Sequence, residues 1–110
     1  MSIDFVRPKR LPEANIQAEL YNVLKFNKIE SILGYRFKEF RLRADLIVIK
    51  NNKIICACEI KSNRDFNKEP NLDTRQFRKY QALGIPIFYC NHMDKIEKVV
   101  NLIKDLYYDC

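Results

Sequence analysis

The sequence predicts a single α/β domain in which helices cover both faces of a mixed central sheet. Helix-spaced apolar stripes and short β-branched runs follow one another in the order α-β-β-β-α-β-α. The two central runs, 42–50 and 53–61, are apolar at most positions, which is typical of strands buried on both faces. A chain of 110 residues with 47% hydrophobic residues supplies one core, so we expect residues 1–110 to form one domain.

The first predicted elements are a helix and a strand. We expect a helix over about 12–27, because Pro12 suits a first helical turn and the following apolar residues share one face. Those residues are Ile16, Leu20, Val23 and Leu24. Gly34 is predicted to mark a turn, and the strand after it alternates apolar and basic side chains from Tyr35 to Arg41.

The remaining elements follow from turn residues and periodicity. Asn51-Asn52 predicts a turn between strands 42–50 and 53–61, since asparagine tolerates left-handed backbone angles. Residues 62–72 are polar and are predicted to form a loop. A helix capped by Asp73 or Thr74 then runs to Leu83, Gly84 ends it, and a strand covers 87–90. The core thus spans about 12–90, and a further helix is predicted over about 93–107.

The charge of the chain favours a polyanionic partner. Twenty Lys and Arg residues against 14 Asp and Glu residues give a net charge of +6, which points to nucleic acid first. A solvated basic surface is the alternative. The candidate nucleic-acid contacts are Arg41, Arg43, Arg64, Lys68, Arg75, Arg78 and Lys79.

The apolar segments exclude other classes of protein. No apolar run approaches the roughly 18 residues that span a membrane, and the N-terminal residues do not resemble a signal peptide, so we expect a cytoplasmic protein.

Cys56 and Cys58 point to the same face of a strand and are predicted to be reduced core residues, as is Cys90. The cysteines form no C-x-x-C pair, and we expect neither a zinc site nor a small-molecule cofactor.

Three ionisable residues, Asp45, Glu59 and Lys61, lie inside the two central apolar runs. Strand side chains alternate, so the register of the hairpin decides whether Asp45 and Glu59 meet. A two-residue turn pairing Lys50 with Lys53 puts them on opposite faces. A three-residue loop pairing Lys50 with Ile54, or an equivalent one-residue bulge, puts them directly opposite each other. We predict this second arrangement, with Ile47 facing Ala57 and Ile49 facing Ile55, because it avoids two opposed lysines.

Paired carboxylates suit a divalent cation. Two carboxylates about 4 Å apart repel by roughly 4 kcal/mol at an effective dielectric near 20. Magnesium prefers carboxylate oxygens together with water and phosphate, and a nearby lysine can bind the attacked phosphate or orient the attacking water. The trio therefore suits metal-dependent phosphodiester hydrolysis. The alternative is a structural ion pair between Lys61 and either acid.

The residues Ala44-Asp45 followed by Glu59-Ile60-Lys61 resemble the D…(D/E)-x-K signature of the PD-(D/E)XK nuclease superfamily. The α-β-β-β-α-β order over about 12–90 is similar to the restriction-endonuclease-like core of that superfamily. Ala44 departs from the usual proline. The resemblance implies that Asp45, Glu59 and the Ile60 carbonyl bind Mg²⁺, with Mn²⁺ able to replace it, and that Lys61 is catalytic.

Two helices carry further matches. Glu13, in Glu13-Ala14-Asn15-Ile16-Gln17, resembles the E-x-x-I-Q opening of VRR-type nucleases, which implies a further metal ligand. Glu19 is the alternative acid, and Glu13 is otherwise a helix N-terminal acid that complements the dipole. Gln76 and Tyr80 resemble the Q-x-x-x-Y motif of RecB-like nucleases and share a helix face, which implies catalytic roles. His92 is interpreted as a cap or surface residue, with a DNA or catalytic contact as the alternative.

The sequence thus leads to a magnesium-dependent DNA endonuclease that is similar to small junction resolvases. Recognition of branched DNA and a homodimer that cleaves both strands are part of this expectation. The alternatives are a non-catalytic nucleic-acid-binding protein and a nuclease subunit of a larger repair, defence or mobile-element complex.

Overall fold

The elements of the computed structural model follow the predicted order, and the structure describes residues 11–61 and 74–109. Four strands form one sheet in the order β1-β2-β3-β4, in which β1, β2 and β3 are antiparallel neighbours and β3 pairs with β4 in parallel. The bounds are α1 (Leu11–Phe26), β1 (Ser31–Phe37), β2 (Leu42–Lys50), β3 (Lys53–Ile60), α2 (Thr74–Leu83), β4 (Ile87–Cys90), a 3-10 turn η1 (Met93–Lys95) and α3 (Ile96–Asp109). The expected mixed sheet within an α/β fold is confirmed.

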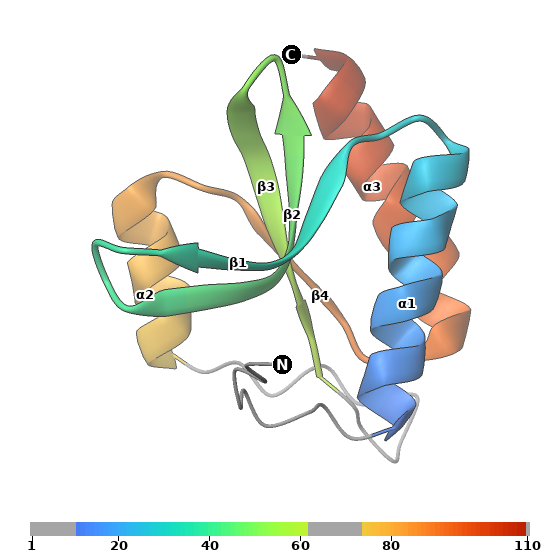
Figure 1. The fold of residues 1–110 in the computed structure, drawn as a ribbon, viewed down its shortest axis with the longest axis horizontal. Helices are drawn as coiled ribbons and strands as arrows, with labels where there is room; N and C mark the ends of the chain where they lie inside the picture. Colours follow the sequence, from blue (N-terminus) through green and yellow to red (C-terminus); the bar gives the residue numbers. More distant parts are fainter. Residues whose placement is uncertain (1–10, 62–73, 110) are drawn as a thin grey trace, which may run out of the picture.

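Helices cover both faces of the sheet, as the two apolar strand faces predicted. Helices α1 and α3 lie beside each other on one face, and α2 lies on the other (Figure 1). The first core lies under α1 and α3 and contains Ile16, Leu20, Leu24, Ile29, Leu46, Val48, Cys56, Cys58, Ile60, Cys90, Ile96, Val99, Val100 and Ile103. The second core lies under α2 and contains Phe37, Leu42, Ala44, Ile47, Ala57 and Tyr80.

The first strand differs from its prediction. It begins at Ser31 rather than near Tyr35, and it ends at Phe37, so Phe40 lies in the turn before β2. Gly34 marks no turn but lies within β1 with a φ of +65°. The pattern of alternating aromatic and basic residues extended the predicted strand too far, because Arg41, with φ 51°, adopts the left-handed backbone of a tight connection.

The β2–β3 hairpin combines the two registers considered from the sequence. The turn has two residues, Asn51 and Asn52, both with positive φ (52° and 64°), so Lys50 pairs with Lys53 and Ile49 with Ile54. The predicted three-residue loop and the Ile49–Ile55 pair are therefore wrong. A bulge between Val48 and Ile49 then shifts the register by one residue, which brings Ile47 opposite Ala57 and Leu46 opposite Cys58. The bulge named as the equivalent solution is confirmed.

The cysteines agree with their prediction, whereas the final helix begins later than predicted, because the 3-10 turn η1 (Met93–Lys95) precedes α3 (Ile96–Asp109). Cys56, Cys58 and Cys90 are free and buried. A hydrogen bond with Cys56, followed by burial, raises the pKa of the Cys58 thiol, which keeps it neutral in the first core. His92 caps η1, where its Nδ1 accepts a hydrogen bond from Asp94 N over 3.1 Å, so its reading as a cap is confirmed.

Candidate active site at the centre of the sheet

At Asp45, the alternate side chains of β2 switch from one face of the sheet to the other. Leu42 and Ala44 belong to the second core, whereas Leu46, two residues after Ala44, belongs to the first core. Alternate residues of a regular strand point to the same face, so the strand turns over between Ala44 and Leu46. The neighbouring strand is irregular at the same place, since the β1–β2 register passes from Leu33–Leu46 to Tyr35–Ala44 with Gly34 in its left-handed conformation between them.

The Asp45 carboxylate replaces a main-chain carbonyl as a hydrogen-bond acceptor between β2 and β3. The β2–β3 register ends at Leu46–Cys58, and the next β3 amide on that side belongs to Ile60. Ile60 N–H donates to Asp45 Oδ2 over 2.7 Å instead of to a β2 carbonyl. The Asp45 carbonyl, which points away from β3, accepts a hydrogen bond from Gln17 Nε2 of α1 over 2.9 Å. The carboxylate is thus fixed at the point where β2 and β3 separate.

Glu59 lies one residue beyond the last β2–β3 pair, Leu46–Cys58, and near the Asp45 carboxyl, which acts on its pKa. Its side chain is 3% exposed, and its Oε1 accepts a hydrogen bond from the Tyr80 hydroxyl over 2.7 Å. Burial, followed by the charge of Asp45, raises the pKa of Glu59 to about 8. Burial and the charge of Glu59 raise the pKa of Tyr80 as well, so its hydroxyl stays protonated and remains a donor.

Lys61 follows Glu59 in a half-buried position at the end of β3. Its N–H donates to the Cys90 carbonyl over 3.0 Å, which extends the parallel pairing with β4 by one residue. Its charge favours the ionised form of Glu59, in the sense expected of an ion pair, but this effect is outweighed by burial and by Asp45.

The predicted acids of α1 are placed differently from each other. Glu19 is exposed, whereas Glu13 is half-buried and lies one helical turn before Gln17, which bonds Asp45. Within 11–61 and 74–109, however, no three side chains of the types His, Cys, Asp or Glu gather in a group that could hold a metal ion. Glu13 is thus on the helix face nearest the site but is not brought together with Asp45 and Glu59.

The two predicted residues of α2 face the site from the second core. Tyr80 is fully buried, and its ring packs edge-on against Phe37 with the centroids 6.0 Å apart. Gln76 lies one turn earlier in a half-buried position, and its Oε1 atom is buried. Helix α2 therefore places the Tyr80 hydroxyl against Glu59 and carries the Gln76 amide on the same helix face.

Sequence reasoning missed three residues around this site. Gln17 was part of the quoted E-x-x-I-Q pattern, but only its glutamate received a role. Tyr89 pairs with Glu59 in the parallel register, and the bond from Lys61 N to Cys90 O places Asn91 beside Lys61. The Tyr89 hydroxyl and Asn91 Oδ1 are buried. Tyr89 of β4 and Asn91 after it have the i, i+2 spacing of Glu59 and Lys61, but only the parallel register brings them beside these residues.

The candidate nucleic-acid contacts lie on two elements. Arg41 and Arg43 are exposed at the start of β2, and Arg75 and Arg78 are exposed on α2, with Lys79 half-buried. Phe37 and Leu42, at the two ends of the β1–β2 connection, pack with Tyr80 of α2 in the second core, so this connection lies next to α2 (Figure 1). Arg64 and Lys68 fall outside the described residues.

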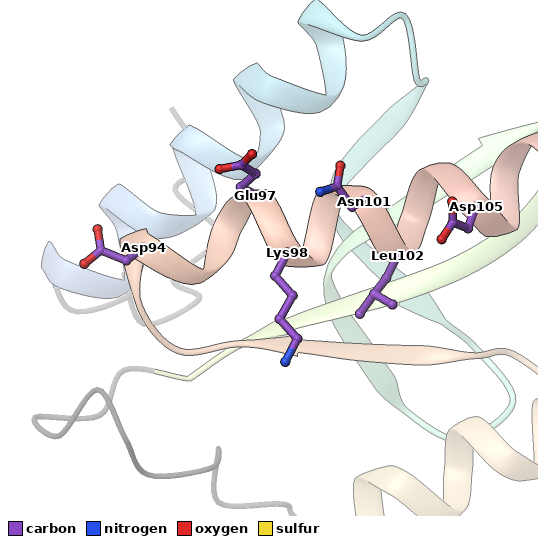
Figure 2. A pocket seen from close by; sticks show the side chains of 6 residues that line it. All are labelled: Asp94, Glu97, Lys98, Asn101, Leu102 and Asp105. Carbon is purple, nitrogen blue, oxygen red and sulfur yellow. The ribbon is translucent and has the colours of Figure 1, made fainter.

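A shallow hollow along the outer side of α3 has the opposite charge. It is lined by Asp94, Glu97, Lys98, Asn101, Leu102 and Asp105 (Figure 2). Three acids against one lysine make this surface unfavourable for a polyanion. The acidic hollow on α3 and the exposed Arg75 and Arg78 of α2 thus lie on opposite faces of the sheet (Figure 1).

No family model, curated protein or solved structure matches this chain. In the part of the chain that the structure describes, no helix has the length and apolar character needed to cross a membrane. A function is therefore inferred from the residues of the site.

Proposed function

We propose that this protein is a magnesium-dependent phosphodiesterase that cleaves DNA and that its fold is the restriction-endonuclease-like core of the PD-(D/E)XK superfamily. The observation that carries the proposal is the carboxyl pair: Glu59 is buried near Asp45, and burial together with the charge of Asp45 raises the pKa of Glu59 to about 8. Ionisable groups are rarely buried in strands without a partner of opposite charge. A hard divalent cation is the partner that two carboxylates favour.

The donor set fits magnesium. Asp45 and Glu59 offer carboxylate oxygens, and the N–H and C=O of one strand residue point to the same neighbour. Because Ile60 N–H bonds Asp45, the Ile60 carbonyl is also directed to β2. These three groups would hold the ion. A bound magnesium ion supplies a Lewis acid that polarises the phosphodiester and lowers the pKa of a water molecule.

The other residues have distinct tasks in this proposal. Lys61, beside Glu59, offers an ammonium group to the charge that develops on the attacked phosphate. Tyr80 holds Glu59 by its 2.7 Å hydrogen bond and keeps the second core closed to water behind the site. Gln76 is proposed to contact the substrate or a water molecule from the same helix face. Lys61 is thus the member of the site that acts directly on the substrate's charge.

The proposed path of DNA follows the exposed arginines. The backbone would lie over Arg41, Arg43, Arg75 and Arg78, away from the acidic surface of α3, and contact with phosphates would make binding salt-dependent. Cleavage of both strands needs two sites, so we propose that the active form is a homodimer. A small domain of this kind is suited to reading the shape of branched DNA.

The test is cleavage of branched, nicked and linear DNA in Mg²⁺ by the wild type and by two pairs of variants. Asp45→Asn and Lys61→Met should lower cleavage by at least about 100-fold, since each removes several kcal/mol of charge stabilisation. The matched controls Asp105→Asn and Lys98→Met, both on the outer side of α3, should keep wild-type rates. Salt-sensitive DNA binding without cleavage of any substrate would instead identify a non-catalytic binding protein.

A further inference from the structure

The backbone of β2 is irregular at a residue on which the site depends. Asp45 lies where the strand turns over between Ala44 and Leu46, and Gly34 beside it has a φ of +65°. Successive strand residues direct their carbonyls to opposite neighbours, so the Asp45 carbonyl points to the β1 side, between the pairs Leu33–Leu46 and Tyr35–Ala44. A carbonyl at such a position can accept a hydrogen bond from an element outside the sheet.

Helix α1 supplies that element. Gln17 is half-buried, and its Nε2 donates to the Asp45 carbonyl over 2.9 Å from 28 residues away in the chain. Leu20 and Leu24, one and two turns later, are fully buried in the first core and fix the helix against the sheet. The amide is therefore presented from a rigid support rather than from a flexible surface.

Asp45 is held from two sides. Gln17 bonds its carbonyl over 2.9 Å, and Ile60 N–H bonds its Oδ2 over 2.7 Å. A rotation about the Cα of Asp45 would change both hydrogen bonds, so a residue that holds the carbonyl limits the directions open to the carboxylate.

We propose that Gln17 is a positioning residue that holds the Asp45 peptide so that its carboxylate faces Glu59 and can share a divalent cation with it. The cation-binding part of this inference rests on the proposed function. The positioning part does not, because the contact between Asp45 and Ile60 exists in the protein without a cation.

The experiment compares the wild type with Gln17→Met, which keeps the length of the side chain and its helix propensity but lacks the donor. The matched control is Gln81→Met at an exposed position of α2. The first readout is the NMR shift of the Ile60 amide proton in EDTA, which reports its bond to Asp45. The second is Mn²⁺ affinity by calorimetry. We expect Gln17→Met to move the amide shift and to weaken Mn²⁺ binding about tenfold, as loss of outer-shell support does, while Gln81→Met changes neither.

The outcomes separate the two claims. An Ile60 amide shift unchanged in Gln17→Met overturns the positioning role, whatever the wild type binds. A moved amide shift in a protein whose wild type binds no Mn²⁺ supports positioning and overturns the proposed cation site. If Gln17→Met does not fold, Gln17→Glu, which also lacks the donor when ionised, replaces it; failure of both to fold would make Gln17 a purely structural residue and overturn the proposal.

Discussion

The Tyr80 hydroxyl donates a 2.7 Å hydrogen bond to Oε1 of Glu59, and this bond joins α2 to the central strand β3. Both groups are buried, and the bond is one of the few influences that lower the pKa of Glu59 against burial and the charge of Asp45. The proton on Tyr80 is held firmly, because burial and Glu59 raise its own pKa. Tyr80 is therefore a fixed hydrogen-bond donor, whereas the charge of the Glu59 carboxyl depends on its surroundings.

Replacing Tyr80 with Phe removes this donor and keeps the ring that packs on Phe37. We expect unfolding free energy to fall by about 1–2 kcal/mol, since Oε1 of Glu59 loses a buried hydrogen bond. The pKa of Glu59 should rise further, because the bond favours its charged form. Urea denaturation measures the first effect, and NMR titration of the Glu59 carboxyl measures the second. Tyr108→Phe, at a side chain that is 63% exposed, should change neither.

The pH dependence of stability follows from the pKa of Glu59. The value rises from 4.5 in the unfolded reference to about 8 in the folded protein, so the folded state binds the proton more tightly. Stabilisation from this proton is complete below pH 4.5 and is lost as the pH rises through 8, by up to about 5 kcal/mol. Without divalent cations, the wild type should therefore lose stability relative to Glu59→Gln between pH 5 and pH 9. A difference that stays constant with pH would contradict the raised pKa.

Cation binding should release a proton near neutral pH. A cation needs the ionised carboxylate, whereas most Glu59 is protonated at pH 7 if its pKa is about 8. Calorimetry in buffers of different ionisation enthalpy should therefore detect close to one proton released per Mg²⁺ bound at pH 7, and almost none at pH 9.5. Equal release at both pH values would show that another group is displaced.

The two glycines provide a matched pair of variants. Gly34 and Gly84 have φ values of +65° and +68°, so an alanine at either position costs about 1–2 kcal/mol of backbone strain. A Cβ at Gly34 would lie 3.0 Å from Arg43 Nη2, whereas nothing lies within 4 Å at Gly84. Both variants should lower the melting temperature by similar amounts. Only Gly34→Ala, beside Asp45, should also weaken Mn²⁺ binding.

The order of elements could be predicted because each element has a local signal. Leu20 and Leu24 give α1 its helical face, and Gly84 ends α2 through its left-handed backbone, where Ile85 N bonds Tyr80 O. The Ile47–Ala57 pair, which brings Glu59 near Asp45, was also predictable in kind, since the charged residues demanded one extra residue in the hairpin. The position of the extra residue could not be predicted, because Asn51 and Asn52, both with positive φ, already make a complete two-residue turn.

The parts of the site that were not predicted depend on contacts between distant segments. The sequence around Gly34 does not distinguish a turn from a kink within a strand. Only the pairing of β1 with β2 on either side of Gly34 shows that it lies within a strand. The role of Gln17 depends on how α1 crosses β2, and the places of Tyr89 and Asn91 depend on the parallel register of β4. None of these arrangements follows from periodicity within one element.

The central claim is that Asp45 and Glu59 share one divalent cation. The most direct measurement is the anomalous difference density of a crystal soaked in Mn²⁺ at a pH above 8, where Glu59 is ionised. The account predicts a single peak in contact with the two carboxylates and the Ile60 carbonyl, and no such peak in an Asp45→Asn crystal. A saturated crystal without density between Asp45 and Glu59, or with a peak that persists in Asp45→Asn, would contradict it.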